Sequence, residues 1–273
     1  MVLTLLNGQY IQPDQPVLYA DDRGFHYGDG LFETMLLKQG KVRFLEDHWQ
    51  RIAAGCEKLS IPMPDEALFE QELKLVTANH DSGVVKFILS RGRGERGYRY
   101  PSVVTPTRLW QFSPSNQTHS IESGIRVRLC ATRLARNPSL ANIKHCNRLE
   151  QILAQNESQD AEISEGLMLD TDGELVCATM SNIFLIVDQV LVTPDLRFCG
   201  IQGVMRKNIL KLAGTLDVPV EVRAVRGEEL YSADHVFLTN AVRGIRAVTM
   251  LDQHCWSLGA LTQQLISALD KLS

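Results

Sequence analysis

The order of apolar and polar residues predicts hairpins and helices in the first half of the chain. Asn-Gly separates two apolar runs in residues 3–11, and Gln-Gly separates two more in residues 31–44. Such turns between strand-like runs are typical of β-hairpins. The other elements predicted from this pattern are helices over 45–59 and 65–79 and strands over 83–90 and 108–113. This half therefore has α+β character.

The second half of the chain is predicted to be rich in strands as well. Residues 165–170 and 175–187 are apolar runs joined by an Asp-Gly turn. A helix is predicted from residue 203 onwards, and an amphipathic helix is predicted over 257–272. Further strands are predicted over 124–132, 220–225 and 235–240.

A polar stretch divides the chain into two predicted domains. Residues 113–120 read SPSNQTHS, which contains turn formers and no apolar periodicity. We therefore predict an N-terminal α+β domain over 1–112, a linker over 113–120 and a strand-rich α+β domain over 121–273. A length of 273 residues suits two such domains.

Composition and charge narrow the class of partner. The net charge is −4 and no tract of lysine and arginine stands out, so we expect a small-molecule substrate and neither nucleic acid nor a membrane as partner. No stretch approaches the roughly 18 consecutive apolar residues of a membrane span, and the N-terminus lacks the basic region of a signal peptide. The six cysteines show no CxxC spacing. We expect reduced thiols in a soluble cytoplasmic protein, without a metal site.

Residues 142–154, NIKHCNRLEQILA, place a lysine immediately before a predicted helix. Asn147 is predicted to cap the first turn, and Glu150 is predicted to reach back to it. The helix itself is predicted from apolar residues at helical spacing, Leu149, Ile152 and Leu153. Lys144 then lies just outside the helix. Most lysines are solvated, so other features must decide whether this one has a function.

Two glycine-containing segments are candidate anion sites. Gly200 and Gly203 allow a tight backbone just before a predicted helix, and the free N–H groups of Val204 and Met205 would face a phosphate there. A plain connector is the alternative. The GxGxxG pattern within residues 92–97 follows a strand but is not followed by a helix or by the required acidic residue. A dinucleotide site is therefore not expected there.

Several charged residues are ambiguous when each is considered alone. Arg51 would normally be a surface residue of an amphipathic helix, and neither His48 nor His145 has an acidic partner at a recognisable spacing. The glycine-containing loop also carries four arginines that suit a carboxylate-bearing ligand, although a solvated basic turn is the alternative: Arg91, Arg93, Arg96 and Arg99.

Six motifs, taken in order, resemble the fold-type IV pyridoxal-phosphate enzymes: YGDGLFET, HWQRI, IKHCNRLEQ, SNIF, GIQGVMR and FLTNA. This group contains branched-chain aminotransferases, D-amino-acid aminotransferases and 4-amino-4-deoxychorismate lyases, and the resemblance runs nearly end to end. The stretch RNPSLANIKHCNRLEQ most resembles the lyases, which belong to the folate pathway. The resemblance implies a two-domain α+β fold like that of D-amino-acid aminotransferase, with pyridoxal 5′-phosphate at the domain interface, and a homodimer.

The resemblance also implies roles for individual residues. The lysine that matches Lys144 binds the cofactor covalently in the family, and Lys144 would also be the catalytic base. Arg51 matches the arginine that binds the cofactor phosphate. Other positions that match phosphate contacts are Val204, Met205, Thr239 and Asn240.

Substrate contacts can be transferred from the related D-amino-acid aminotransferases. There, an arginine-rich loop and a strand tyrosine bind the substrate carboxylate, and the matching positions here are Arg96, Tyr98 and Phe32. Tyr98 replaces a histidine of that family.

One position departs from the family pattern. A glutamate usually stands five residues before the asparagine of SNIF, where it pairs with the pyridine nitrogen of the cofactor, and this chain has Cys177 there. Glu174 lies three residues away along a predicted strand and would therefore point to the opposite face.

These observations favour a lyase that converts 4-amino-4-deoxychorismate to 4-aminobenzoate and pyruvate. A D-amino-acid or branched-chain aminotransferase is the first alternative, because one fold can support several reactions. A cofactor-binding protein without turnover is the second alternative, and Cys177 is its motivation.

Overall fold

Five residues from the middle of the chain belong with its N-terminal part. In the computed structural model, which describes residues 2–12, 14–114 and 124–272, the chain divides into two units. Unit 1 comprises Met1–Thr118 and Ile143–Asn147, and unit 2 comprises His119–Asn142 and Arg148–Ser273. Most of the predicted linker 113–120 lies outside the described residues. The sequence did not predict that the segment containing Lys144 would join unit 1.

Unit 1 is built on a six-stranded antiparallel sheet with the strand order β2-β1-β6-β5-β3-β4. Its strands are β1 (Leu3–Leu6), β2 (Gln9–Ile11), β3 (Gly30–Lys38), β4 (Lys41–Val42), β5 (Ser82–Ser90) and β6 (Thr107–Pro114). Both predicted hairpins are confirmed. The residue pairs Asn7-Gly8 and Gln39-Gly40 have the positive φ angles that such two-residue turns require.

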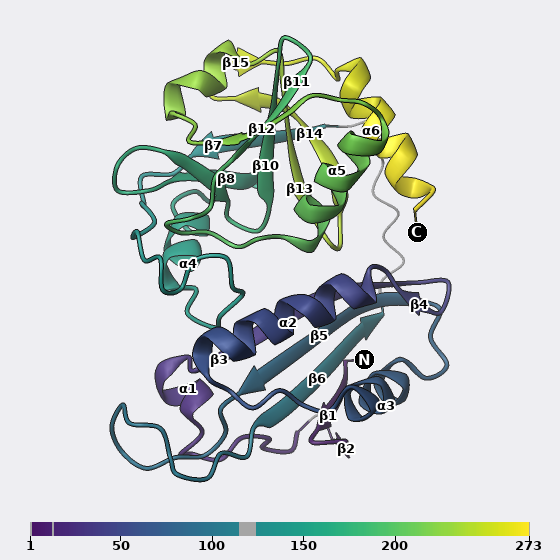
Figure 1. Ribbon diagram of the computed structural model, residues 1–273, viewed down its shortest axis with the longest axis vertical. Coiled ribbons are helices and arrows are strands. Elements are labelled where there is room, and N and C mark those ends of the chain that lie inside the picture. Colours follow the sequence, from purple (N-terminus) through teal and green to yellow (C-terminus); the bar gives the residue numbers. More distant parts are fainter. Residues whose placement is uncertain (1, 13, 115–123, 273) are drawn as a thin grey trace. The chain divides into compact units, whose positions relative to one another are not determined.

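The helices of unit 1 pack against this sheet (Figure 1). The two predicted helices are confirmed as α2 (Leu45–Leu59) and α3 (Glu66–Thr77), whereas the short α1 (Arg23–Tyr27) was not predicted. Asp65 caps α3 by accepting hydrogen bonds from the amides of Ala67 and Leu68. Phe69 of α3 contacts the rings of Phe87 and Trp110 on the sheet, and this aromatic cluster forms the core of the unit.

Unit 2 contains a nine-stranded mixed sheet. The strand order is β12-β11-β10-β13-β14-β7-β8-β9, and β15 pairs with β14. Its strands are β7 (Ile125–Leu129), β8 (Ile163–Leu169), β9 (Leu175–Ala178), β10 (Asn182–Val187), β11 (Val190–Pro194), β12 (Val220–Arg223), β13 (His235–Asn240), β14 (Gly244–Leu251) and β15 (His254–Cys255). The strands β11, β14 and β15 were not predicted.

The helices of unit 2 are α4 (Leu149–Gln155), α5 (Val204–Thr215), the 3-10 helix η2 (Gly227–Ser232) and α6 (Ala260–Asp270). The predicted helices that begin near residue 203 and lie within 257–272 are confirmed as α5 and α6, which pack against each other. One large cluster of buried apolar residues, which includes Ile183, Leu238 and Val248, forms a core of this unit. No helix within the described ranges is long and apolar enough to cross a membrane.

The predicted capping of α4 is wrong. Arg148, not Asn147, is the N-cap residue, and no side chain in the described part caps this helix. The side-chain amide of Asn147 donates instead to the carbonyl oxygen of Gly28, at 3.0 Å. The Glu150 carboxylate accepts from the amide of Ala135, at 2.8 Å. Distant partners in the fold therefore replace the local ones that the motif indicated.

We predict that Asp22→Ala destabilises unit 1. The Asp22 side chain is 1% exposed and accepts hydrogen bonds from the Gly24 amide and from the hydroxyls of Ser90 and Thr107. The substitution removes the acceptor of the buried Ser90 hydroxyl and of the half-buried Gly24 and Thr107 donors, which should lower the free energy of unfolding by roughly 2–4 kcal/mol, measured by urea denaturation. The exposed Asp14→Ala variant is the control, with an expected change below about 0.5 kcal/mol. Equal stability of the two variants would contradict this account.

Candidate active site

The main chain around Lys144 is hydrogen-bonded to the open edge of β3. The carbonyl oxygen of Lys144 accepts from the Phe32 amide at 2.9 Å, and the Cys146 amide donates to the Gly30 carbonyl at 2.9 Å. Leu31 and His145 form an antiparallel bridge between these two bonds. Two main-chain hydrogen bonds thus hold the segment that contains Lys144. Lys144 lies outside any helix, as predicted from the sequence.

The glycines of the YGDG motif allow this close approach. Gly28 has a φ of 64°, and a Cβ atom at this position would lie 2.8 Å from the side-chain oxygen of Asn147. A Cβ atom at Gly30 would lie 2.6 Å from the Leu89 carbonyl oxygen. Side chains at either position would displace the neighbouring strand or the lysine segment.

Phe32 provides the aromatic surface beside the lysine. The Nζ atom of Lys144 lies 4.1 Å from the centre of the Phe32 ring, and Nζ of Lys86 lies 5.8 Å from the same centre. The structure therefore brings together Lys144 and Phe32, two of the residues predicted from sequence. Sequence reasoning missed Lys86.

Arg51 is oriented by a buried carboxylate that the sequence analysis also missed. Its Nε donates to Glu33 Oε1 at 2.7 Å and its Nη2 donates to Glu33 Oε2. Glu33 is 1% exposed. Burial alone would raise the pKa of Glu33, but the charge of Arg51 and hydrogen bonds from His48 and Arg51 outweigh it and hold the pKa at about 2. Glu33 is therefore a permanent anion that fixes one edge of the guanidinium.

His48 does have an acidic partner, contrary to the expectation from sequence. Its Nδ1 lies 2.6 Å from Glu33 Oε2, and the residue is fully buried. The partner is 15 residues away in the chain, because it lies on β3 whereas His48 lies on α2. Its Nε2 atom is buried and has no hydrogen-bond partner among the residues described.

The arginine-rich loop divides into structural and exposed arginines. Arg91 is 1% exposed and donates to the Asp29 carboxylate and to the carbonyls of Leu59 and Ser60. Arg93 pairs with Asp21. Both arginines form ion pairs within unit 1, but only Arg91 is buried, and Arg93 is exposed like Arg96 and Arg99.

The same loop is not a nucleotide-binding turn, because no helix follows it. Arg23 instead donates to the carbonyl oxygens of Gly97, Tyr98 and Arg99 and so fixes the path of the loop. The Tyr98 ring contacts Tyr27 but is 85% exposed. Both Tyr98 and Arg96 therefore lie exposed on this loop of unit 1.

The N-terminus of α5 has the features of an anion site. The first turn begins at Val204 and Met205, contains no acidic residue, and follows Gly203, which has no capping side chain. Helix geometry leaves the first N–H groups without partners inside the helix. Asn182 fixes the preceding turn by donating to the Ile201 carbonyl, and it also pairs with Thr239 of β13. Unit 2 thus gathers three of the predicted phosphate-binding positions around Asn182.

Asn240 has a supporting role in a hydrogen-bond chain. Its side-chain oxygen accepts from the amides of Val242 and Arg243, and its side-chain nitrogen donates to the Ser181 hydroxyl at 3.1 Å. That hydroxyl donates in turn to Glu165 at 2.7 Å. Burial raises the pKa of Glu165, although these hydrogen bonds oppose the effect. The hydrogen bonds of Asn240 thus fix the turn between β13 and β14.

Cys177 carries no charge at neutral pH. It lies on β9 in an apolar cluster with Val176, Leu196 and two further cysteines, Cys130 and Cys199. Burial raises the pKa of Cys177 to about 12, and the neighbouring Cys199 adds to the effect. Glu174 does not supply the missing carboxylate at this position, because its side chain contacts Arg136. The cysteine of this position is therefore a neutral core residue.

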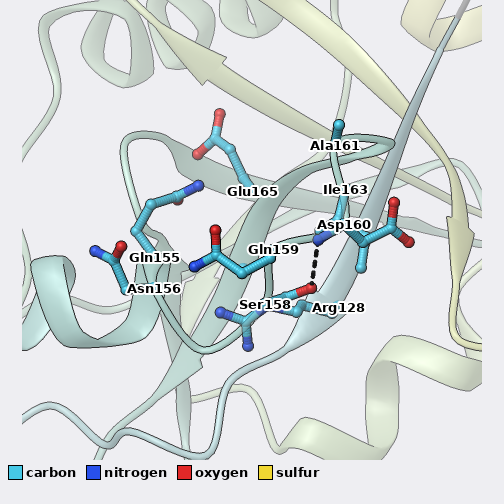
Figure 2. Close-up of a pocket in the computed structure, with 10 residues that line it drawn as sticks. Arg128, Gln155, Asn156, Ser158, Gln159, Asp160, Ala161, Ile163 and Glu165 are labelled. Atoms are coloured by element: carbon cyan, nitrogen blue, oxygen red, sulfur yellow. Dashed lines mark hydrogen bonds between the residues drawn. The ribbon is translucent and has the colours of Figure 1, made fainter.

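Unit 2 also contains an open polar cavity that none of the predicted site residues lines (Figure 2). Its volume is about 280 Å³. Figure 2 shows the loop between α4 and β8 on one side, where the Asp160 amide donates to the Ser158 hydroxyl. The lining also includes Arg128, Gln155 and Glu165. The cavity offers hydrogen-bonding groups but no reactive lysine, so we do not assign the chemistry to it.

Comparisons with known proteins identify the family of this chain. A family model described as amino-transferase class IV matches residues 30–251. An aminodeoxychorismate lyase of Vibrio harveyi is 32% identical over 250 residues, which is 89% of this chain and 92% of the relative. A crystal structure of 4-amino-4-deoxychorismate lyase from Pseudomonas aeruginosa is 43% identical, with a TM-score of 0.92 and 98% of each chain covered.

A branched-chain amino acid aminotransferase from Escherichia coli has the same fold. Its structure is 22% identical, with a TM-score of 0.88, and the match covers 99% of this chain and 93% of that one. At this level of identity the likeness concerns the fold and not the reaction.

We predict that the Glu33 network makes stability depend on pH in acid. The wild type should be more stable than Glu33→Gln at neutral pH, because the variant leaves the charge of Arg51 without its buried counter-ion. The pKa of Glu33 is about 2 in the folded chain and 4.5 in an unfolded reference. The unfolded chain therefore takes up a proton first as the pH falls, and the difference in unfolding free energy should shrink between these two values.

Urea denaturation at a series of pH values measures this difference. Glu57→Gln, an exposed change on α2, the helix that carries His48 and Arg51, is the control and should show a small difference that does not depend on pH. A wild-type advantage that persists unchanged to the lowest pH would show that Glu33 is not the titrating group.

Proposed function

Because the chain belongs to the class IV amino-transferase family, we propose that it is a pyridoxal 5′-phosphate-dependent lyase that converts 4-amino-4-deoxychorismate to 4-aminobenzoate and pyruvate. This reaction is a step of folate biosynthesis. The similarity to two such lyases over nearly the whole chain supports the proposal. The single observation that carries the chemistry is Lys144, held on the edge of β3 with its amine beside the Phe32 ring.

The described residues fit pyridoxal phosphate in three respects. Lys144 offers an amine outside any helix, close to an aromatic ring. Arg51 is a fixed cation, because Glu33 holds one edge of its guanidinium. The first turn of α5, at Val204 and Met205, presents N–H groups with no acidic residue nearby in the turn. An amine and two phosphate-binding elements are the donor set that this cofactor requires.

When bound, pyridoxal phosphate supplies an aldehyde that joins to amines and a conjugated ring that accepts an electron pair. Lys144 would hold it through a covalent bond from Nζ. Once the substrate amine is bound, the Nζ amine of Lys144 would act as the general base that removes the proton from C4 of the substrate ring. The bond from C3 to the enolpyruvyl oxygen breaks, this fragment takes up a proton to become pyruvate, and the ring becomes aromatic. No atoms beyond those of the substrate are needed.

Arg51 and the α5 N-terminus would hold the phosphate away from the reacting carbon. Their contribution is therefore to affinity and orientation of the cofactor, not to proton transfer. Thr239 and the turn fixed by Asn240 would complete this phosphate site, and Cys177 would lie near the pyridine nitrogen. Phe32 would contact the substrate beside Lys144, and Arg96 and Tyr98 would contact its carboxylates.

The alternatives lead to different products. A D-amino-acid or branched-chain aminotransferase would convert its cofactor to the pyridoxamine form when given an amino acid, whereas the proposed lyase would release pyruvate from aminodeoxychorismate. A cofactor-binding protein without turnover would do neither. Incubation of the purified protein with each substrate distinguishes the three, and wild-type pyruvate release is the direct test of the proposal.

The proposed enzyme is a cytoplasmic homodimer. All six cysteines are free thiols, which fits a reducing compartment. The helix α4, directly after the lysine segment, exposes three apolar side chains that a second copy of the chain could cover: Leu149, Ile152 and Leu153.

We predict that Lys144→Ala abolishes lyase turnover. Both the covalent bond to the cofactor and the base are lost, so the rate of pyruvate release should fall by several orders of magnitude. Borohydride reduction of the wild type with pyridoxal phosphate should attach the cofactor to Lys144, as mapped by peptide mass spectrometry. Lys38→Ala, at the exposed end of β3, is the control and should keep full activity. A label on another lysine would show that Lys144 is not the lysine that binds the cofactor.

We also predict that Cys177→Glu makes stability depend on the cofactor. In the cofactor-free protein, the new carboxylate is buried among apolar residues and should lower the melting temperature. A pyridine nitrogen nearby would be protonated and pair with it, so pyridoxal phosphate should raise the melting temperature more in this variant than in the wild type. Side transamination of ordinary amino acids should rise as well.

Cys130→Glu is the matched control, because Cys130 belongs to the same apolar cluster. It should be destabilised without an extra response to the cofactor. If both variants respond alike, Cys177 is a core residue with no relation to the pyridine nitrogen.

A further inference from the structure

Lys86 lies on β5 beside the aromatic ring that the reactive lysine contacts. It pairs with Thr34 on β3, and its neighbour Ile88 pairs with Phe32. Side chains two residues apart on a strand share one face of the sheet, so Lys86 and Phe32 are diagonal neighbours on that face. The Nζ atoms of Lys86 and Lys144 lie 5.8 and 4.1 Å from the centre of the Phe32 ring. The two amines are therefore closer to each other than the sum of these distances.

The position of Lys86 has no evident structural use. Lys86 is exposed, and it forms no ion pair with any residue that the structure describes. Its neighbours on the same strand face, Val84 and Ile88, are half-buried apolar residues. The arginines of the adjacent loop differ in this respect, since Arg91 and Arg93 are neutralised by Asp29 and Asp21. A cation without a described counter-ion thus remains on the sheet face that carries Phe32, whose ring Lys144 contacts.

We propose that Lys86 binds the ring carboxylate of the substrate while Lys144 acts at its amine. The proposal rests on the proposed function, because it needs a substrate with an amine and a carboxylate at opposite ends of one six-membered ring. Both lysines place their Nζ atoms near a ring of the same size, at 5.8 and 4.1 Å from the centre of the Phe32 ring. A carboxylate gains a charge-assisted hydrogen bond from Lys86, and this bond fixes the far end of the substrate. Lys86 would therefore determine specificity for aromatic or cyclohexadiene acids over amino acids with short side chains.

Two ligands that differ only in this carboxylate test the proposal. The product 4-aminobenzoate contains it, whereas aniline lacks it, and both present the same amine. We expect the wild type with bound pyridoxal phosphate to prefer 4-aminobenzoate in equilibrium binding, and we expect Lys86→Gln to reduce this preference by about 10- to 100-fold. Lys86→Arg should keep most of the preference, because the cation is retained.

The control is Lys38→Gln, which removes one exposed lysine from the end of β3 and should leave the preference unchanged. An undiminished preference in Lys86→Gln overturns the proposal, and Lys86 is then a solvated lysine. An equal loss of affinity for both ligands also overturns it, because Lys86 would then act on the amine end through Lys144. The proposal is also overturned if the wild type binds aniline as tightly as 4-aminobenzoate.

Wild-type turnover of aminodeoxychorismate is measured separately. A protein that releases pyruvate but whose ligand preference does not depend on Lys86 refutes only this inference. A protein that releases no pyruvate refutes the proposed function, whatever the result for Lys86.

Discussion

The position of Lys144 depends on main-chain hydrogen bonds to the edge of β3, because this segment has no helix or turn of its own to fix it. That edge is free only because β4 is two residues long and pairs with Leu37 and Lys38 at the far end of β3. A longer β4 would occupy the edge near Gly30 and Phe32. The short hairpin therefore determines where the lysine can attach, and the glycines of the YGDG motif let the two chains approach.

A half-buried carboxylate, Asp29, and a buried one, Glu33, give the arginines of unit 1 opposite roles. Asp29 accepts from both Arg23 and Arg91, and Arg91 is thereby enclosed in the fold. Glu33 also accepts from an arginine, but it holds Arg51 by one edge and leaves this residue partly accessible. An unpaired buried charge is costly. Removal of either carboxylate would therefore leave its arginine without a counter-ion. A carboxylate–arginine pair thus stabilises the arginine-rich loop in one place and orients Arg51, a candidate phosphate ligand, in the other.

The predictable parts of this fold are those with a local cause. The hairpin turns at Asn7-Gly8 and Gln39-Gly40 and the helices α2 and α5 follow from residue type and periodicity, and the structure has them. The cap of α4 was not predictable, since the side-chain amide of Asn147 bonds to Gly28, 119 residues away. Glu33 and His48 were missed for the same reason, because a strand and a helix must first pack before they meet. The motifs named Lys144 as the candidate reactive lysine and Arg51 as the candidate phosphate arginine, but not the residues that hold them.

Under the proposed function, in which Cys177 lies near the pyridine nitrogen, its neutral thiol bears on which reaction the site can support. A carboxylate near a pyridine nitrogen keeps it protonated and strengthens the ring as an electron acceptor, whereas a thiol with a pKa of about 12 supplies no charge. Transamination needs a carbanion that lives long enough to be protonated on the cofactor. The lyase reaction instead expels a leaving group and gains an aromatic ring, so the electron pair is delocalised for less time. A weaker acceptor therefore costs the lyase less than it costs an aminotransferase, and burial of a cysteine at this position is compatible with the first reaction and unfavourable for the second.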